Sequence, residues 1–332
     1  MTYEQIIQNI QNKIYQPVYL LSGDEPFFID QISGMIEKSV LTDPEKEFNQ
    51  TVLYGRETDV PTIVSYAKRF PMMSNHQVLI VKEAQNLDKI EELDTYAKQP
   101  LDSTILVICY KYKKFDQRKA LAKTVKKTGV LFESKKLYDN QIPQWIMQHM
   151  EVSGYKITPK ATALLNEFLG NDLSKISNEL GKIRINVPAE TTITDAVIEE
   201  YIGISKDYNV FELQKALGSR EIVKANRIIN HFASNQKDNP LVKVVGFLFA
   251  FFNKVMIYHQ STNKSKNVVA AALGVNPFFV RDYQQASVKY SLRKLIHIIS
   301  LLREYDLKAK GVGNSSSTDG DLMKELIYKI LH

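Results

Sequence analysis

The turn that follows the first apolar run of the chain has the layout of a phosphate-binding loop. Val18 to Leu21 is typical of a buried strand, and a helical pattern begins just after Gly23 and Pro26. A strand, turn and helix in this order can hold a phosphate through free backbone N–H groups and the helix dipole. In an active domain this turn would bind a nucleoside triphosphate.

The residue types that handle phosphate are missing from this turn. A P-loop needs G-x-x-x-x-G-K-[ST], because its glycines wrap the phosphates, its lysine neutralises them and its hydroxyl holds magnesium. Here Gly23 is followed by Asp24, Glu25 and Pro26, and then by apolar residues. The two carboxylates would repel a triphosphate, and Pro26 removes a backbone donor. We therefore predict a degenerate P-loop that binds no ATP, and we expect no cofactor.

Other positions give no sign of an enzyme site. The apolar run Thr104 to Tyr110 ends in lysine and tyrosine rather than in the Asp-Glu pair that would serve magnesium and catalysis. Six scattered histidines lack the spacing of metal ligands, and the single cysteine, Cys109, is interpreted as a buried strand thiol. We predict no catalytic residue and no metal site. An α/β domain that never bound nucleotide remains an alternative interpretation.

A strongly basic segment follows the same apolar run. Between Lys111 and Lys136 there are ten Lys and Arg against two acidic residues, a net charge of +8. The segment is either a solvated helix face or a ridge that contacts phosphate, and lysines there would position a nucleic acid rather than read its sequence. The candidate contacts to DNA or to another subunit are Lys111, Lys113, Lys114, Arg118 and Lys119.

Phe70, Pro71, Met72 and Met73 lie between a helical pattern and the next strand. The two methionines could be core filler. However, adjacent side chains point in different directions in a helix or a strand, so both can hardly occupy one narrow core stripe. An exposed methionine pair is flexible and apolar, and such a pair fills pockets on partner proteins.

The elements that position these residues divide the chain into an α/β part and a helical part. Strands are predicted at 18–21, 50–54, 77–81, 104–110 and 130–132, alternating with helices that include a polar one over about 89–98. This alternation predicts an α/β domain with a parallel sheet. From Ile142 onward the pattern is helical with no convincing strand, which predicts two all-α domains. The predicted domains are 1–140, 141–205 and 206–332, the last containing a Gly- and Ser-rich loop at 311–320.

Composition supports a folded protein with an uneven distribution of charge. The 332 residues carry a net charge of +6, but residues 206–332 hold 19 basic against 10 acidic residues, a net charge of +9. That asymmetry suggests a polyanion near the last third of the chain. The N-terminal residues lack an apolar signal, and the apolar run Val244 to Phe252 is too short to span a bilayer. We therefore expect a cytoplasmic protein and no membrane.

Several segments together resemble the delta subunits of the bacterial sliding-clamp loader, which are part of the DNA polymerase III holoenzyme. The resemblance covers nearly the whole chain and is carried by VYLLSGDEPFFID, FNQTVLYGRE, RFPMMSNHQVLIVKEAQNL, KKFDQRKALAKTVKKTG and NELGKIRI, in this order and spacing. It implies an AAA+-like N-terminal domain that does not hydrolyse ATP, a small helical lid and a helical collar domain.

The resemblance also implies partners and a binding site. Members bind the beta sliding clamp, open or hold open one ring interface, and assemble with other clamp-loader subunits into a hetero-pentamer that acts on primed DNA. Their clamp-binding pair, often Leu or Phe, corresponds to Met72 and Met73, with Phe70 and Pro71 beside them. No catalytic activity is expected from this chain itself, although it would belong with a nucleotidyltransferase complex. Alternatives are a nucleic-acid-binding helical module and an ATPase paralogue of the loader.

Overall fold

The computed structural model describes residues 1–205, 207–313 and 316–332. These residues form two compact units, Met1–Leu137 and Tyr138–His332. Lys206, predicted as the first residue of the last domain, and Asn314 and Ser315 of the predicted Gly- and Ser-rich loop lie outside the described residues.

The first unit is built on a five-stranded sheet in the order β2-β3-β4-β1-β5, in which all neighbouring strands run parallel. The apolar runs form its three central strands, β3, β4 and β1, because helices cover both faces of a parallel sheet and residues of both parities are buried there. This confirms the predicted α/β class with a parallel sheet and all five predicted strands. The strands are β1 (Val18–Gly23), β2 (Gln50–Tyr54), β3 (Gln77–Lys82), β4 (Thr104–Lys111) and β5 (Val130–Ser134).

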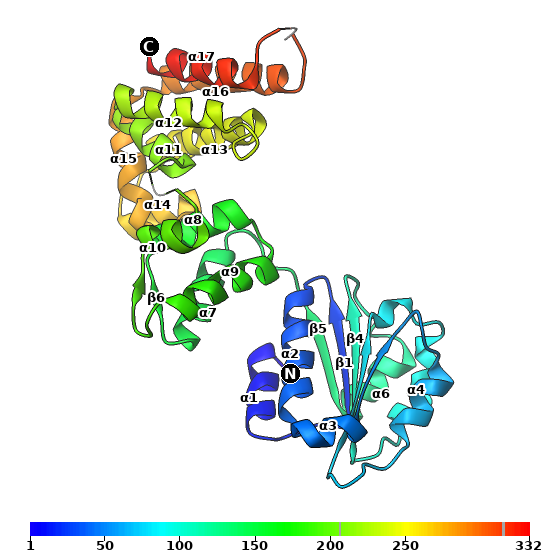
Figure 1. The fold of residues 1–332 in the computed structure, drawn as a ribbon. Helices are drawn as coiled ribbons and strands as arrows, with labels where there is room; N and C mark the ends of the chain where they lie inside the picture. The colour runs from blue at the N-terminus through cyan, green and yellow to red at the C-terminus, as the bar shows by residue number, and fades with distance from the viewer. Residues whose placement is uncertain (206, 314–315) are drawn as a thin grey trace. The chain divides into compact units, whose positions relative to one another are not determined.

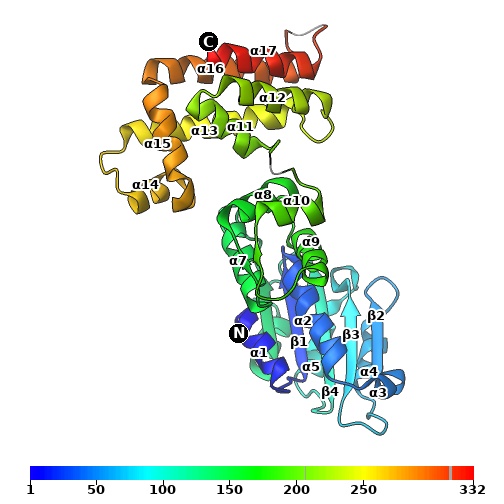
Figure 2. The same cartoon turned by 60° about the vertical axis from the view of Figure 1, so that its left-hand side comes forward.

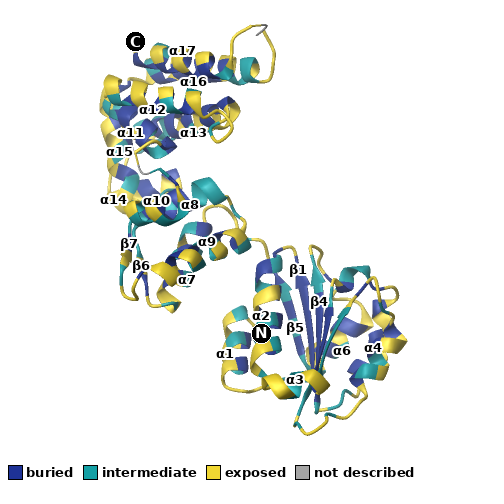
Figure 3. Ribbon diagram, viewed as in Figure 1, coloured by how far each residue is buried: buried dark blue, intermediate teal, exposed yellow. Residues whose placement is uncertain are grey.

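Helices cover both faces of this sheet (Figure 1). On β1, Tyr19 and Leu21 pack with two N-terminal helices, whereas Val18 and Leu20 pack with the helices of the opposite face. Strands β1, β3 and β4 are mostly buried, and the helices expose their outer sides (Figure 3). The N-terminal pair is α1 (Tyr3–Gln11) and α2 (Pro26–Ser39). The opposite face has α4 (Val60–Ala67), η1 (Ala84–Asn86), η2 (Ile90–Leu93), α5 (Asp94–Ala97) and α6 (Ala120–Thr128). Helix α3 (Asp43–Asn49) leads into β2.

One predicted helix of this unit is wrong in form. The sequence predicts one polar helix over about 89–98, but the chain forms the 3₁₀ turn η2 followed by the single α-helical turn α5. Ile90 and Leu93 are both buried three residues apart, a spacing that places both on one side of a 3₁₀ turn.

The second unit is mostly helical (Figure 2). It contains a strand pair that was not predicted, because β6 (Lys156–Ile157) and β7 (Thr192–Ile193) pair in parallel. Two residues are too few to show the alternation by which a strand is predicted. The helices are α7 (Ile142–Val152), α8 (Pro159–Leu169), α9 (Leu173–Asn186), α10 (Asp195–Ile202), α11 (Val210–Ser219), α12 (Ile222–Ser234), α13 (Leu241–Gln260), α14 (Lys266–Leu273), η3 (Pro277–Phe279), α15 (Val280–Lys289), α16 (Leu292–Ala309) and α17 (Asp319–Leu331).

Helix α13 is longer than the apolar run that the sequence suggested. The helix has 20 residues, and an 18-residue window within it has a mean hydropathy of 1.7, so by length and composition alone it could cross a membrane. However, Leu248, Phe252 and Val255 lie in the core shared with the neighbouring helices of the bundle. We interpret α13 as a core helix, since its burial there accounts for its apolar composition.

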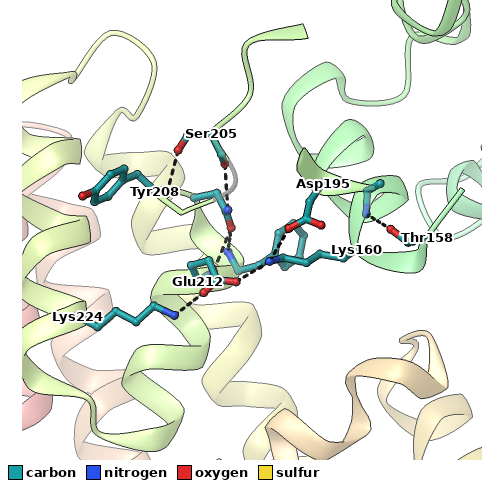
Figure 4. A network of polar contacts seen from close by, with 10 residues as sticks. Thr158, Lys160, Asp195, Ser205, Tyr208, Glu212 and Lys224 are labelled. Carbon is teal, nitrogen blue, oxygen red and sulfur yellow. Dashed lines mark hydrogen bonds and ion pairs between the residues drawn. The ribbon is translucent and has the colours of Figure 1, made fainter. Parts of the chain in front are cut away.

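Ion pairs around the buried Glu212 link several helices of the second unit (Figure 4). The Glu212 carboxylate of α11 lies 3.0 Å from Lys160 Nζ of α8 and 2.5 Å from Lys224 Nζ of α12. Lys160 also pairs with Asp195 of α10 at 2.9 Å. Burial alone would raise the pKa of Glu212, but hydrogen bonds from Lys224 and Lys160 outweigh it and lower the pKa. The carboxylate is therefore ionised at neutral pH and joins three helices.

Candidate functional site

The residues singled out in the sequence lie at opposite edges of the sheet. Because the strands are parallel, residues that follow strands meet at one edge and residues that precede strands meet at the other. The turn 23–26 follows β1 and the basic segment follows β4, so both lie at the carboxyl edge. The segment 70–73 precedes β3 and lies at the amino edge.

At the carboxyl edge, the backbone donors of the phosphate-loop turn are already used. The Gly23 N–H donates to the Lys113 carbonyl and the Asp24 N–H donates to the Ser134 carbonyl, both at 3.0 Å. The buried Glu25 carboxylate accepts from the Phe27 N–H at 3.1 Å and caps α2. Pro26 has no N–H to give. The groups that would hold a phosphate are therefore bonded within the domain.

The space at this turn is also filled. Gly23 has φ of +141°, and a Cβ added to it would lie 1.9 Å from the Ser134 carbonyl oxygen. Only glycine permits this close approach of the turn to the end of β5. Gly23, which stands where a P-loop would begin, therefore allows the turn and the end of β5 to pack closely.

Most of the predicted basic contacts are paired with nearby carboxylates. Lys111 pairs with Asp30, and Lys119 lies 3.2 Å from Glu91. Lys114 lies 3.3 Å from Glu133, and Arg118 binds Asp116 at 2.9 Å and holds its pKa at about 2. Lys113 is exposed, and its carbonyl accepts from Gly23. These pairs reduce the local positive field that the run of lysines suggests.

Cys109 lies in β4 and is 1% exposed. Burial raises the pKa of its thiol to about 11, against a smaller opposing effect of a hydrogen bond with Ser33. A buried neutral thiol is a poor nucleophile, so Cys109 belongs to the core.

At the amino edge, the segment 70–73 presents apolar side chains to solvent. Phe70 is 77% exposed, Met72 is 61% exposed and Met73 is 100% exposed, whereas Pro71 is half-buried. Met73 also has φ of 53°, in the left-handed region that side chains other than glycine rarely adopt. The two methionines are therefore not core filler in this fold.

The buried side chain of Asn49 holds this segment. Its Oδ1 accepts from the Met72 N–H at 2.6 Å, and its Nδ2 donates to the Met72 carbonyl at 2.9 Å. Nδ2 also donates to the Glu45 carbonyl at 3.1 Å. The amide thus bonds both backbone groups of Met72 and ties them to the end of α3.

Two further contacts fix the flanks of the segment. The Gln77 side-chain amide donates to the Arg69 carbonyl at 2.5 Å and to Thr104 Oγ1 at 2.7 Å. On the other side, the pKa of Glu45 in α3 is lowered by hydrogen bonds from Thr42 and from the Ser74 side chain. The segment is therefore bonded before, at and after the methionine pair.

Strand register explains why α3 can reach this segment. β2 and β3 are parallel neighbours, and Gln50 pairs with Val78. Asn49 directly precedes β2, and Gln77 opens β3, so the two residues lie next to each other at the amino edge. A helix ending at Asn49 therefore lies beside any loop that enters β3.

Comparison with known proteins assigns the family. Residues 19–135 match the model of the DNA polymerase III delta subunit, and residues 207–327 match the model of its C-terminal domain. This chain belongs to the DNA polymerase III delta-subunit family.

Individual relatives agree with this delta-subunit assignment. The DNA polymerase III subunit delta of Bacillus subtilis strain 168 is 25% identical over 322 residues, which cover 93% of this chain and 91% of the relative. The solved structure of the Bacillus subtilis DNA clamp loader delta protein is 20% identical, covers 99% of both chains and has a TM-score of 0.56. At this identity the structural likeness concerns the fold.

Sequence reasoning missed the residues that hold the methionine pair in this delta-family chain. Asn49 appears in the sequence as an ordinary polar residue at the end of a short helix, 23 positions before Met72. Its role depends on strand order, which periodicity does not reveal. The available signal was an asparagine directly before a strand, where a side-chain amide can bond a neighbouring loop.

Proposed function

We propose that this chain is the subunit of a bacterial clamp loader that binds the beta sliding clamp and holds one ring interface open for loading onto primed DNA. The observation that carries this proposal is the exposed pair Met72 and Met73, held by Asn49 in a member of the delta-subunit family. Phe70 and Pro71 belong to the same surface.

Binding would bury the methionine side chains in an apolar pocket of the clamp. Each contributes on the order of 1.5 to 3 kcal/mol when fully buried. The hydrogen bonds of Asn49 order the segment before it binds, which reduces the entropy lost on association. Opening the ring needs no additional force. A protein that binds the open ring more tightly than the closed ring shifts the equilibrium toward the open ring by the difference between the two affinities.

In this proposal the chain leaves ATP hydrolysis to other subunits. The turn 23–26 offers no set of free N–H groups for phosphate, and Gly23 packs against Ser134. The exposed Met73 and the turn lie at opposite edges of the sheet, so the clamp and a neighbouring subunit could contact the domain at the same time.

We further propose that residues 1–140, 141–205 and 206–332 act as AAA+-like, lid and collar domains of a cytoplasmic hetero-pentamer. The collar would join the sibling subunits. The basic segment Lys111 to Lys119 remains a proposed contact with primed DNA or with a sibling, with Lys113, Lys114, Arg118 and Lys119 exposed on its surface.

Size-exclusion chromatography of the protein mixed with the clamp of the same organism tests the proposal. A shared peak at micromolar concentration supports it, and separate elution of the two proteins contradicts it. Calorimetric titration with ATP and magnesium tests the non-hydrolysing assignment separately. Heat of binding at micromolar ATP would contradict that part.

A further inference from the structure

Phe48 is an exposed aromatic side chain beside the methionine segment. It is 69% exposed, and it lies in α3 directly before Asn49. A single exposed apolar residue is common on a protein surface. Phe48 differs because its helix is the element that holds Met72.

Phe48 neighbours both residues of α3 that bind the segment. Glu45, Phe48 and Asn49 stand at positions i, i+3 and i+4, which are neighbours on a helix surface. Glu45 accepts a hydrogen bond from Ser74, and Asn49 bonds both backbone groups of Met72. Phe48 is therefore the apolar side chain that α3 exposes next in sequence to the Asn49 contact.

The rest of α3 is polar. Asp43 and Lys46 pair with each other at 2.8 Å, and Glu47 is exposed. An apolar centre with a charged rim is the usual composition of a protein interface. The exposed apolar side chains of α3 and of the segment are Phe48, Phe70, Met72 and Met73, and we name these four residues the amino-edge patch.

We propose that Phe48 is a third anchor for the sliding clamp, so that the clamp contacts α3 as well as the methionine segment. This inference rests on the proposed function and extends its binding site. The aromatic ring supplies a rigid contact that methionine cannot, because Phe has two side-chain torsions and Met has three. Rigid aromatic anchors often dominate interface energies.

The test compares clamp affinities of the full-length protein and its variants by surface plasmon resonance. Phe48→Ala is expected to weaken clamp binding by roughly tenfold or more, with the melting temperature unchanged. Phe48→Leu, which keeps an apolar anchor, is expected to retain most of the affinity. The matched control is Tyr112→Ala, which removes an aromatic that is 66% exposed at the carboxyl edge of the same sheet.

Comparison with the double variant Met72→Ala/Met73→Ala separates the two proposals. If the double variant loses binding while Phe48→Ala and Tyr112→Ala both bind like the wild type, the third anchor is wrong and the proposed function stands. If the double variant also binds like the wild type, both the third anchor and the proposed function are wrong. A loss confined to Phe48→Ala and the double variant supports both.

Discussion

The side-chain amide of Asn49 and the backbone of Met72 form a two-way hydrogen-bonded pair, at 2.6 and 2.9 Å. This pair crosses from the end of α3 to the segment before β3, and it leaves the Met72 side chain free to face solvent. It connects the packing of the sheet to the presentation of the proposed clamp-binding residues.

Asn49→Asp should lower both stability and clamp affinity. The carboxylate cannot donate to the Met72 and Glu45 carbonyls, and it would lie against both oxygens. We expect the free energy of unfolding to fall by about 1 to 3 kcal/mol, measured by urea denaturation. We also expect weaker clamp binding, because the segment then loses order before it binds.

The matched control for that change is Asn75→Asp, which adds the same charge at an exposed position of the same loop. If Asn75→Asp weakens clamp binding as much as Asn49→Asp does, added charge explains the effect and the positioning role of Asn49 is wrong.

Met73→Gly and Met73→Ala should separate backbone strain from side-chain function. Both remove the thioether and should weaken clamp binding. Only glycine relieves the left-handed conformation at φ of 53°, so Met73→Gly should be more stable than Met73→Ala by up to about 1 kcal/mol. Denaturant titration of the two variants measures the difference, and the reverse order of stability contradicts the observed backbone.

Gly23→Ala should strongly destabilise the first unit. The new methyl group would meet the Ser134 carbonyl in a backbone conformation that alanine avoids, so we expect a loss of roughly 3 kcal/mol or more. Gly34→Ala in α2 is the control, because its added Cβ meets nothing within 4 Å and alanine favours helix by about 1 kcal/mol. Thermal unfolding of both variants should therefore shift in opposite directions.

Glu167→Gln should change how the second unit responds to pH. Glu167 lies in α8, 3.4 Å from Lys243 Nζ, and burial raises its pKa from 4.5 to about 7. The folded state thus binds this proton more tightly than the unfolded state does. Stability from this group is present below pH 4.5 and is lost as the pH rises to about 7.

The glutamine variant lacks this titration, so its melting temperature relative to the wild type should rise between pH 5 and pH 8. Glu212→Gln gives the opposite sign at lower pH, because the pKa of Glu212 is lowered from 4.5 and its stabilisation is lost as the pH falls below 4.5. Parallel pH profiles for the two variants would contradict the assigned environments.

Sequence patterns predicted the sheet of the first unit well because its strands are short apolar runs between helices. Strand β1 has buried residues on both faces of the sheet, namely Val18, Leu20 and Leu21, so its apolar composition alone predicts a strand. The failures were local. The turns η2 and α5 replaced one continuous helix, and β6 and β7 were too short to leave a pattern.

The candidate site was predicted in part. Adjacent positions suggested that Met72 and Met73 could not both be core residues, and both are exposed. The roles of Asn49 and Gln77 could not be predicted from the sequence, because they depend on which strands are neighbours in the sheet. The ion pairs of the basic segment could not be predicted for the same reason, since Asp30 and Glu91 come from other elements.

The affinity of the double variant Met72→Ala/Met73→Ala for the clamp of the same organism tests the central claim most directly. Titration calorimetry should show binding that is weaker by roughly 100-fold or more, since two buried side chains are lost. Circular dichroism should show an unchanged fold. A correctly folded double variant that binds the clamp with wild-type affinity would contradict the account.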